Sequence, residues 1–423
     1  MKRRLIIIFF LFVVSSFLIF FKFNLIPQNI SFDEIEFSRL AISLNNSNYI
    51  PYSNLATGHS TLYFYIILLS FKIFGISNFA LRFPSALFGI LSIFTFYKLL
   101  KNIFNEDKKI FYSILGALIL LTSRWFLNFA RFSFEGTFLL FLELMSIFFF
   151  LLFFKNRERR HPFRATTLFI VISGIFAGLS FLSYTPGRIF FLVPLFLLFL
   201  KKSSFKNYFF YIISFLVVAF PLLFYLIVNN DIRFNEISIL TQNSSFSTKI
   251  SLISENVQKT ALMFNIKGDK NGRHNFPGKP ALNPILGILF VLGVILSARK
   301  IKEFPNKLFL FYFLVSLLPT LLTLPHDNPN MNRTFTVLPA VIYFVIYSIK
   351  FLSTINFRIN KQLLIMFFTG IILISSIIEL RTYFFYQSRV FRNSFEVKCN
   401  IREILSSTSK IIPKKCLVSK NEF

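Results

Sequence analysis

Long apolar runs, separated by short polar breaks, make up most of the chain. The runs are about 17 to 22 residues long, the length that an α-helix needs to cross the hydrocarbon core of a bilayer. The pattern therefore predicts an all-α integral membrane protein with about eleven transmembrane helices. The predicted spans are residues 5–23, 83–100, 110–127, 136–154, 166–183, 187–200, 208–228, 282–298, 308–324, 335–352 and 363–380.

A further apolar run, 61–75, is of marginal length. Counting it as a span would turn the basic segments 155–164 and 299–302 outward, although Lys and Arg favour cytoplasmic loops. We therefore expect 61–75 to be a re-entrant or in-plane helix on the outer side, preceded by an interfacial helix over 34–44. The basic breaks that then face inward are 101–109, 155–164, 201–206, 299–307 and 350–361.

Four regions follow from this topology. We predict a catalytic transmembrane module over 1–228 that includes the first outer loop, 24–82. An outer loop or cap over 229–281, a second transmembrane module over 282–380 and an outer polar tail over 381–423 complete the chain. The tail carries several Lys and Arg, which longer translocated segments tolerate. The basic start before the first run, with no small-residue cleavage site after it, predicts an uncleaved anchor.

Composition agrees with a membrane protein, since 55% of the 423 residues are hydrophobic and 19% are aromatic. The net charge of +28 comes from Lys and Arg in the breaks between spans, which is the pattern of topology signals and lipid headgroup contacts. It does not favour a nucleic acid partner. The two cysteines, Cys399 and Cys416, form either one disulfide in an oxidising compartment or two unrelated thiols.

Asp33 and Glu34 lie in an acidic stretch just after the first span, in a chain with only 18 acidic residues. Charge at the mouth of a membrane span is costly, so acids found there are expected to act in a reaction or a transport path. A carboxylate at the outer surface can deprotonate an incoming hydroxyl group. We therefore predict that Asp33 is a catalytic base and that Glu34 assists it.

The predicted topology gathers further polar residues at outer span ends and loops. Arginine offers bidentate contacts to phosphate, so this group suits an anionic lipid phosphate and a group transferred from it. The structural alternatives are arginines that reach headgroups and, for Glu135, an ion pair with Arg131 four residues earlier. The residues are His59, Arg82, Arg131, Glu135, Tyr184, Arg188, Arg273, His274, His326, Asp327 and Arg333.

Several short stretches resemble the polyprenyl-phosphate-dependent glycosyltransferases of the GT-C fold, above all family 39, which includes protein O-mannosyltransferases and bacterial aminoarabinose transferases of lipid A. Residues 32–37 are similar to the family's Asp-Glu motif in the first outer loop, and Ala80-Leu81-Arg82-Phe83-Pro84-Ser85 to its Ala-Leu-Arg-Leu-Pro-Ser. Gly58 to Tyr63 departs from the family's pattern, because Ser60-Thr61 stands where relatives have Pro-Pro. The other similar stretches are 183–188, 273–280 and 332–340, the last two in a bacterial branch.

The resemblance implies an inverting transfer of a hexose or pentose from a polyprenyl-phosphate donor to a lipid, protein or polysaccharide hydroxyl, on the outer face of the cytoplasmic membrane. It implies Asp33 as general base, Glu34 as a catalytic partner, and Arg82, Arg131, Arg188 and His59 at the donor phosphate. Glu135, Tyr184, Arg273, His274 and Arg333 are then expected to bind substrate. No metal or cofactor is expected.

Two other function classes are alternatives. A flippase or other transporter of lipid-linked saccharides would place charges near the midplane and in paired repeats, whereas Glu143 is the main acid within a span. An O-antigen ligase or polymerase would carry its long catalytic loop late in the chain and would not need Asp33. The chain has no P-loop and no Gly-x-Ser-x-Gly, so ATP-driven transport and hydrolysis by a serine nucleophile lack sequence support.

Overall fold

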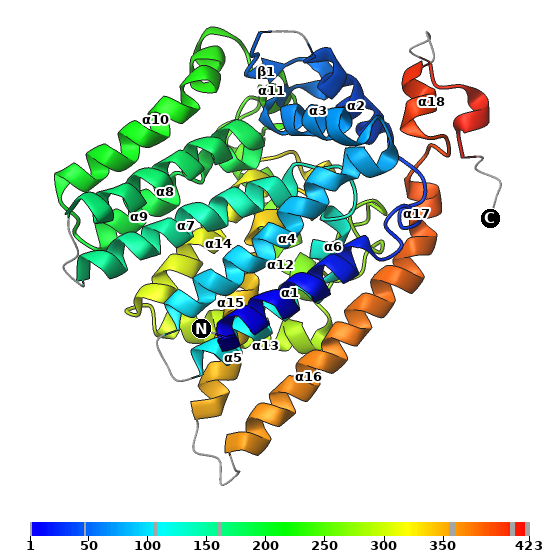
Figure 1. Ribbon diagram of the computed structural model, residues 1–423. Coiled ribbons are helices and arrows are strands. Elements are labelled where there is room, and N and C mark those ends of the chain that lie inside the picture. The colour runs from blue at the N-terminus through cyan, green and yellow to red at the C-terminus, as the bar shows by residue number, and fades with distance from the viewer. Residues whose placement is uncertain are drawn as a thin grey trace.

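The computed structural model describes residues 2–45, 48–104, 108–158, 163–354, 361–406 and 411–418. Within these ranges the protein is helical apart from one short hairpin of β1 (Tyr52–Ser53) and β2 (His59–Ser60), with isolated bridges elsewhere. Most of the long helices run side by side through the molecule (Figure 1). This confirms the predicted all-α membrane fold.

Seven helices of the described residues are long and apolar enough to cross a membrane. Four shorter apolar helices coincide with the remaining predicted spans, and their crossing of the bilayer stays a prediction. The seven are α4 (Asn78–Ile103), α7 (Gly136–Glu158), α8 (Phe163–Ser183), α10 (Phe205–Val228), α14 (Phe304–Leu321), α15 (Leu338–Thr354) and α16 (Lys361–Arg381). The four are α1 (Lys2–Phe20), α5 (Lys109–Thr122), η2 (Thr185–Ile189) with α9 (Leu192–Leu200), and α13 (Pro284–Arg299).

The predicted span 110–127 is interrupted in the structure. Ser123 adopts an extended backbone (φ −60°, ψ 124°), so α5 ends there and a separate short helix, α6 (Arg124–Phe129), begins. The turn is stabilised by Glu379 of α16, whose carboxylate accepts hydrogen bonds from the Arg124 backbone N–H and guanidinium. This long-range pairing, and not a Pro or Gly signal, breaks the helix.

Helix α7 packs between α4 and α8, and α8 packs in turn against α10. The close approach of α8 and α10 depends on Gly174 and Gly178, four residues apart on α8. A Cβ atom at Gly174 would overlap the Ser214 side chain, and one at Gly178 would lie 2.7 Å from Cβ of Val218. Small residues at this spacing are typical of helix contacts within membranes, where backbones approach closely.

The helix ends that flank the connections α4–α5, α7–α8, α9–α10, α13–α14 and α15–α16 lie at one end of the bundle, toward the lower left of Figure 1. Each connection contributes Lys or Arg, as the predicted inward-facing breaks require. Residues 105–107, 159–162 and 355–360 of these breaks, including His161, lie outside the described residues.

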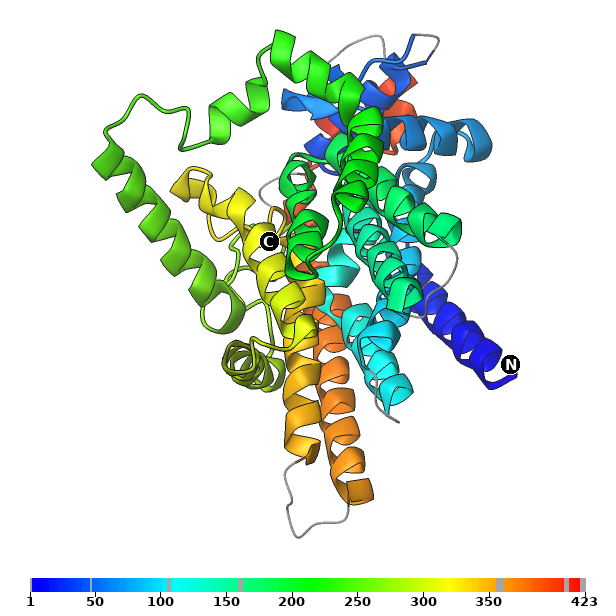
Figure 2. The same ribbon diagram turned by 90° about the vertical axis from the view of Figure 1, so that its left-hand side faces the viewer.

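The first outer loop lies at the other end of the bundle. It contains α2 (Phe32–Ser43), the one-turn η1 (Leu55–Thr57), the hairpin and α3 (Leu62–Phe74). Helix α3 runs across the ends of the long helices in Figures 1 and 2, and its 13 residues span only about 20 Å, less than the roughly 30 Å hydrocarbon core. The in-plane helices predicted for this loop are therefore present.

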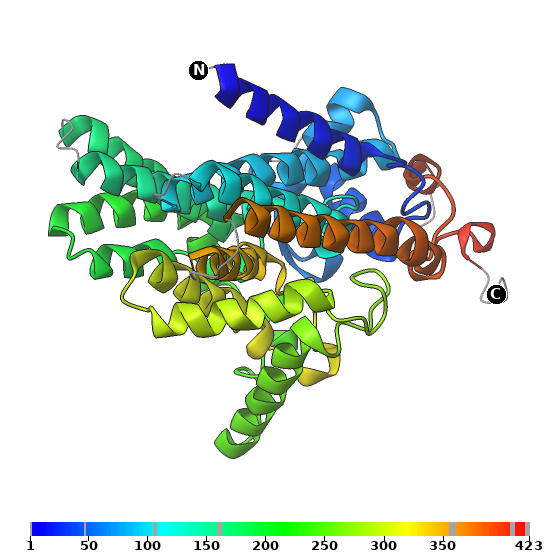
Figure 3. The same cartoon turned by 90° about the horizontal axis from the view of Figure 1, so that it is seen from below.

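The predicted cap over 229–281 contains α11 (Ile232–Ile237) and α12 (Phe246–Asn265). Helix α12 projects from the side of the bundle, as Figures 2 and 3 show. Two single turns, η3 (Pro325–Asp327) and η4 (Phe335–Val337), precede α15.

The tail beyond α16 begins with a π-helical turn (Thr382–Gln387) and α17 (Ser388–Ser394). It ends in α18 (Ile401–Ser406) and η6 (Lys414–Cys416). These last elements lie at the same end of the molecule as α2 (Figure 1). Cys399 and Cys416 form a disulfide, which decides between the two alternatives left open by the sequence.

Candidate active site

Asp33 is the second residue of α2. Ser31 caps this helix through a capping box with Glu34, which fixes where the helix begins and therefore where Asp33 projects. The Asp33 side chain is 61% exposed, and its Oδ2 accepts a hydrogen bond of 2.7 Å from Nη1 of Arg273. It lines a polar cavity of about 140 Å³, here called the Asp33 cavity, together with His59, Arg233, Arg273 and His274.

Glu34, in contrast, is fully buried. Its two carboxylate oxygens accept hydrogen bonds from Nε and Nη2 of Arg82, at 2.7 and 2.9 Å, and from the backbone N–H groups of Ser31 and Ser133. Arg82 is also fully buried and donates to the carbonyls of Pro27 and Asn29. Neither Glu34 nor Arg82 is therefore accessible to a substrate. This does not support the direct catalytic role predicted for Glu34 or the phosphate contact predicted for Arg82.

Arg131 also serves the protein itself. Its buried guanidinium donates to the backbone carbonyls of Leu18, Ile19, Phe21, Lys22 and Ile26, which closes the C-terminal end of α1. A helix leaves its last carbonyls without partners, and a cationic side chain satisfies them well. The predicted phosphate contact of Arg131 is not supported, because its donors already have acceptors. The alternative ion pair with Glu135 does not form either, since Glu135 pairs with His59.

His59, Glu135 and Arg233 form a chain of polar contacts, in which His59 and Glu135 are buried and Arg233 is half-buried. Arg233 can only donate, so Nε2 of His59, 2.6 Å from Nη1 of Arg233, must accept. Nδ1 of His59 then carries the proton and donates to Oε1 of Glu135 at 2.8 Å. Burial and the adjacent Arg233 charge lower the pKa of His59, and their effect outweighs that of Glu135, which raises it. The lowered pKa keeps the imidazole neutral.

A second cavity, of about 320 Å³, is also lined by Arg233 and is here called the arginine cavity. Its charged residues are Arg188, Asp231, Arg233 and Arg333, and its walls are otherwise largely apolar. Apolar lining residues come from α10, α11 and α14, and Tyr184 lines it from the start of η2. They include Leu226, Ile237, Pro319 and Leu322.

Ion pairs hold two of the arginines of this cavity. Arg188 pairs with Asp231, and Nη2 of Arg333 lies 3.1 Å from Oδ2 of Asp327. Burial alone would raise the pKa of Asp231, but the Arg188 charge and the hydrogen bonds from Arg188, Phe234 N–H and Tyr52 bring it below its ordinary value. Arg188 Nε is buried and has no partner among the described residues.

His274 lines the Asp33 cavity but pairs with Asp269, whose Oδ2 lies 2.9 Å from Nδ1 of His274. Asp269 also accepts from the backbone N–H groups of Asn271 and Met331. Because these bonds fix the loop that carries Arg273, His274 and Asp269 hold in place the arginine that contacts Asp33.

Solved structures and a family model share this architecture. The structure is similar to the archaeal oligosaccharyltransferase AglB from Archaeoglobus fulgidus, solved with an inhibitory peptide and a dolichol-phosphate (TM-score 0.56, 17% identity, 92% of this chain). It is also similar to ArnT from Cupriavidus metallidurans bound to undecaprenyl phosphate (TM-score 0.52, 12% identity, 90% of this chain and 75% of ArnT). Residues 58–231 match the model of the dolichyl-phosphate-mannose-protein mannosyltransferase family. This chain has the GT-C fold.

The GT-C fold confirms the resemblance predicted from the motifs. The chain spans 56% of the length of the archaeal oligosaccharyltransferase. A comparison with curated protein sequences gives no match. The similarity thus establishes the architecture, and the chemistry of this GT-C protein has to be argued from its own residues.

The structure brings together most of the predicted site residues, in two groups. His59, Arg273 and His274 line the cavity of Asp33, while Tyr184, Arg188 and Arg333 line the arginine cavity. Glu135 lies behind His59 and lines neither cavity. The sequence analysis missed two residues, Asp231 and Arg233. Both follow the end of α10 directly, so the argument that selected Asp33, a charge at a span exit, would have found them.

Proposed function

We propose that this protein is a membrane glycosyltransferase that moves a sugar from a polyprenyl-phosphate donor to an acceptor hydroxyl. We place the reaction at the outer face of the cytoplasmic membrane, with inversion at the anomeric carbon and Asp33 as the general base. The observation that carries the proposal is the position of Arg233, which lines both the Asp33 cavity and the arginine cavity. A base and a phosphate site that share the lining residue Arg233 suit a displacement at a carbon held between them.

In the proposed reaction, the acceptor hydroxyl binds in the Asp33 cavity and its oxygen attacks the anomeric carbon of the donor sugar. The bond between that carbon and the phosphate oxygen breaks, and the electron pair leaves with the phosphate. Asp33 takes the hydroxyl proton, through the carboxylate oxygen that Arg273 does not hold. Arg273 keeps the carboxylate oriented.

The leaving phosphate is assigned to Arg188, Arg233 and Arg333. Guanidinium groups near this phosphate stabilise the charge that develops as the bond breaks. Arg188 has a buried Nε–H without a partner among the described residues, so it has a donor to spare. The apolar walls contributed by Leu226, Pro319 and Leu322 suit the first isoprene units of the donor.

The outer location rests on two features. The helix ends that flank the basic breaks lie at the end of the bundle opposite α2, and cytoplasmic loops are the ones enriched in Lys and Arg. The Cys399–Cys416 disulfide lies at the same end as α2, and disulfides persist in oxidising compartments. Both support the proposal that Asp33 lies outside the cytoplasm.

The test uses membranes that contain the wild type, Asp33→Asn or the control Glu255→Gln, supplied with a panel of labelled polyprenyl-phosphate sugars and candidate acceptors. Asp33→Asn keeps the shape of the side chain and removes the base, so transfer should fall by about two to four orders of magnitude. Glu255 is on α12, in an exposed pair with Lys259, and its variant should keep full activity.

Normal transfer by Asp33→Asn would exclude Asp33 as the base. If the folded wild type consumes no donor with suitable acceptors present, the transporter alternative becomes the better description. Consumption of one donor would also identify the sugar.

A further inference from the structure

The C-terminal tail pairs with the segment that leads into α2. We call the described residues 395–406 and 411–418 the C-terminal clasp. Its Val397 exchanges both backbone hydrogen bonds with Ile30, at 2.9 and 3.0 Å, and both side chains are fully buried. On its other side, the Lys398 N–H donates to the carbonyl of Cys416, and the Val418 N–H donates to that of Glu396. The clasp thus adds two short extended segments next to Ile30.

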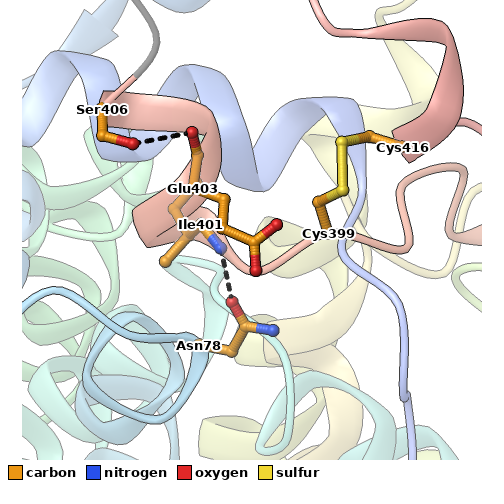
Figure 4. Close-up of a disulfide and its surroundings, with 6 residues drawn as sticks. All are labelled: Asn78, Cys399, Ile401, Glu403, Ser406 and Cys416. Carbon is orange, nitrogen blue, oxygen red and sulfur yellow. Dashed lines mark hydrogen bonds between the residues drawn. A yellow bond between two sulfur atoms is a disulfide. The ribbon is translucent and has the colours of Figure 1, made fainter.

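The disulfide joins these two segments of the clasp. Cys399 and Cys416 come from opposite sides of the pairing, as Figure 4 shows, and they are 17 residues apart. Helix α18 follows directly, and the Ile401 N–H donates to Oδ1 of Asn78 at the start of α4 (Figure 4). The clasp is therefore attached to both the first outer loop and the bundle.

Two contacts connect the clasp to α2, the helix that contains Asp33. Oε2 of Glu396 accepts from the N–H of Phe32, the first residue of α2 and the neighbour of Asp33. The buried Phe395 ring lies 5.9 Å from the guanidinium of Arg82, the residue that holds Glu34. The clasp therefore contacts α2 directly at its N-terminus and indirectly through the Arg82–Glu34 pair.

We propose that Glu396 is a positioning residue for Asp33, and that transfer requires the clasp closed by the Cys399–Cys416 disulfide. The proposal rests on the proposed function, because it concerns the geometry of the same base. Its consequence is redox dependence: a reductant should inactivate the protein although neither sulfur atom lines the Asp33 cavity or the arginine cavity. Closing a loop of this size by a disulfide shifts the docking equilibrium by about a hundredfold in the chain-entropy model.

The experiment uses the purified full-length protein in lipid, before and after reduction, and the double variant Cys399→Ser/Cys416→Ser. Two further variants separate shape from hydrogen bonding: Glu396→Gln keeps an acceptor oxygen, and Glu396→Ala does not. Arg402→Ala, an exposed position on α18, is the matched control. The readouts are amide hydrogen exchange over residues 28–36 and the kcat and KM of transfer for the donor.

We expect reduction and the double variant to raise hydrogen exchange over 28–36 and to lower kcat at least about tenfold, with KM for the donor unchanged. Glu396→Ala should lower kcat about three- to tenfold, the value of one lost hydrogen bond, and Glu396→Gln should restore most of it. A rise in the KM for the donor with kcat unchanged would overturn the positioning role. Full activity together with raised hydrogen exchange over residues 28–36 would also overturn it. Unchanged exchange on reduction would overturn the clasp itself.

These outcomes are separate from those of the proposed function. If the wild type transfers no sugar from any donor, the proposed function fails, while the exchange readout still decides whether the disulfide holds the segment before α2. If the wild type is active and remains so when reduced, only the clasp proposal fails.

Discussion

Arg82 and Arg131 lie where an arginine for a lipid phosphate was expected, yet both bind backbone carbonyls, and Arg82 also binds the buried carboxylate of Glu34. Their guanidinium groups are completely buried and saturated with acceptors from the chain. Arg233, in contrast, comes from the cap and lines both the Asp33 cavity and the arginine cavity. At the scale of the residue, a position at a span end does not show whether an arginine binds a ligand or the protein itself. The acceptors that the folded chain places around the arginine show which it does.

Arg233 is accordingly the arginine whose replacement should matter most for chemistry. Arg233→Ala removes both the proposed phosphate contact and the partner of His59, so we expect kcat/KM to fall by about two to three orders of magnitude. Arg233→Lys keeps the charge but loses the fork geometry and should recover only part of the activity. Transfer assays with the labelled donor measure both.

The control is Arg39→Ala, because Arg39 forms a partly exposed pair with Glu36 on α2 and lines neither cavity. Equal losses in Arg39→Ala and Arg233→Ala would contradict the special place of Arg233 between the cavities.

The sequence predicted a helix over 34–44 directly after Asp33, whereas α2 begins at Phe32 and includes Asp33, because Ser31 caps it in a capping box with Glu34. The same stretch gave no means of separating the roles of Asp33 and Glu34. What separates them is Arg82, 48 residues further on, which takes both oxygens of Glu34 and leaves Asp33 in the cavity. Pairing across such distances is a property of the folded chain.

At the scale of the element, charge parity along the chain predicted that α3 does not cross the membrane, and the structure has it as a short helix across the bundle end. The break at Ser123 was missed, because Ser123 carries no helix-breaking signal and Glu379 comes from a helix much later in the chain. Apolar length and charge thus located the helices well, and they could not show where a tertiary hydrogen bond divides one.

The contact between α8 and α10 offers a test of helix packing. Gly178→Leu adds a side chain where even a Cβ atom would lie 2.7 Å from Val218, so the helices must separate. We expect a loss of roughly 1 to 3 kcal/mol, the usual cost of an overpacked contact. Thermal unfolding in detergent, followed by fluorescence, measures it.

Gly370→Leu on α16 is the matched control, since nothing lies within 4 Å of a Cβ atom there. A similar loss of stability in both variants would show that the α8–α10 contact is not responsible, because Leu favours a helix over Gly at either position.

At the scale of the whole molecule, the fold predicts which end of the bundle faces the cytoplasm. The two native cysteines are joined, so an introduced cysteine is the only free thiol. In intact cells, Asn54→Cys in the first outer loop should react with an impermeant thiol reagent. Asn156→Cys, near the end of α7, should react only after the membrane is opened.

Labelling of Asn156→Cys in intact cells, with Asn54→Cys protected, would invert the proposed topology. Labelling of both would exclude the assignment of their two ends to opposite sides of the membrane.

The pairing of Ile30 with Val397 has a consequence for the order of biosynthesis. Phe32 and its partner Glu396 are 364 residues apart, so the N-terminus of α2 cannot form this hydrogen bond until residue 396 has been synthesised. At the usual pace of translation, this delay lasts roughly 20 to 70 seconds. A nascent chain that already has most of its helices in the membrane would still lack the contact at the start of α2, and it would gain activity only after its last outer segment has arrived and its cysteines have been oxidised.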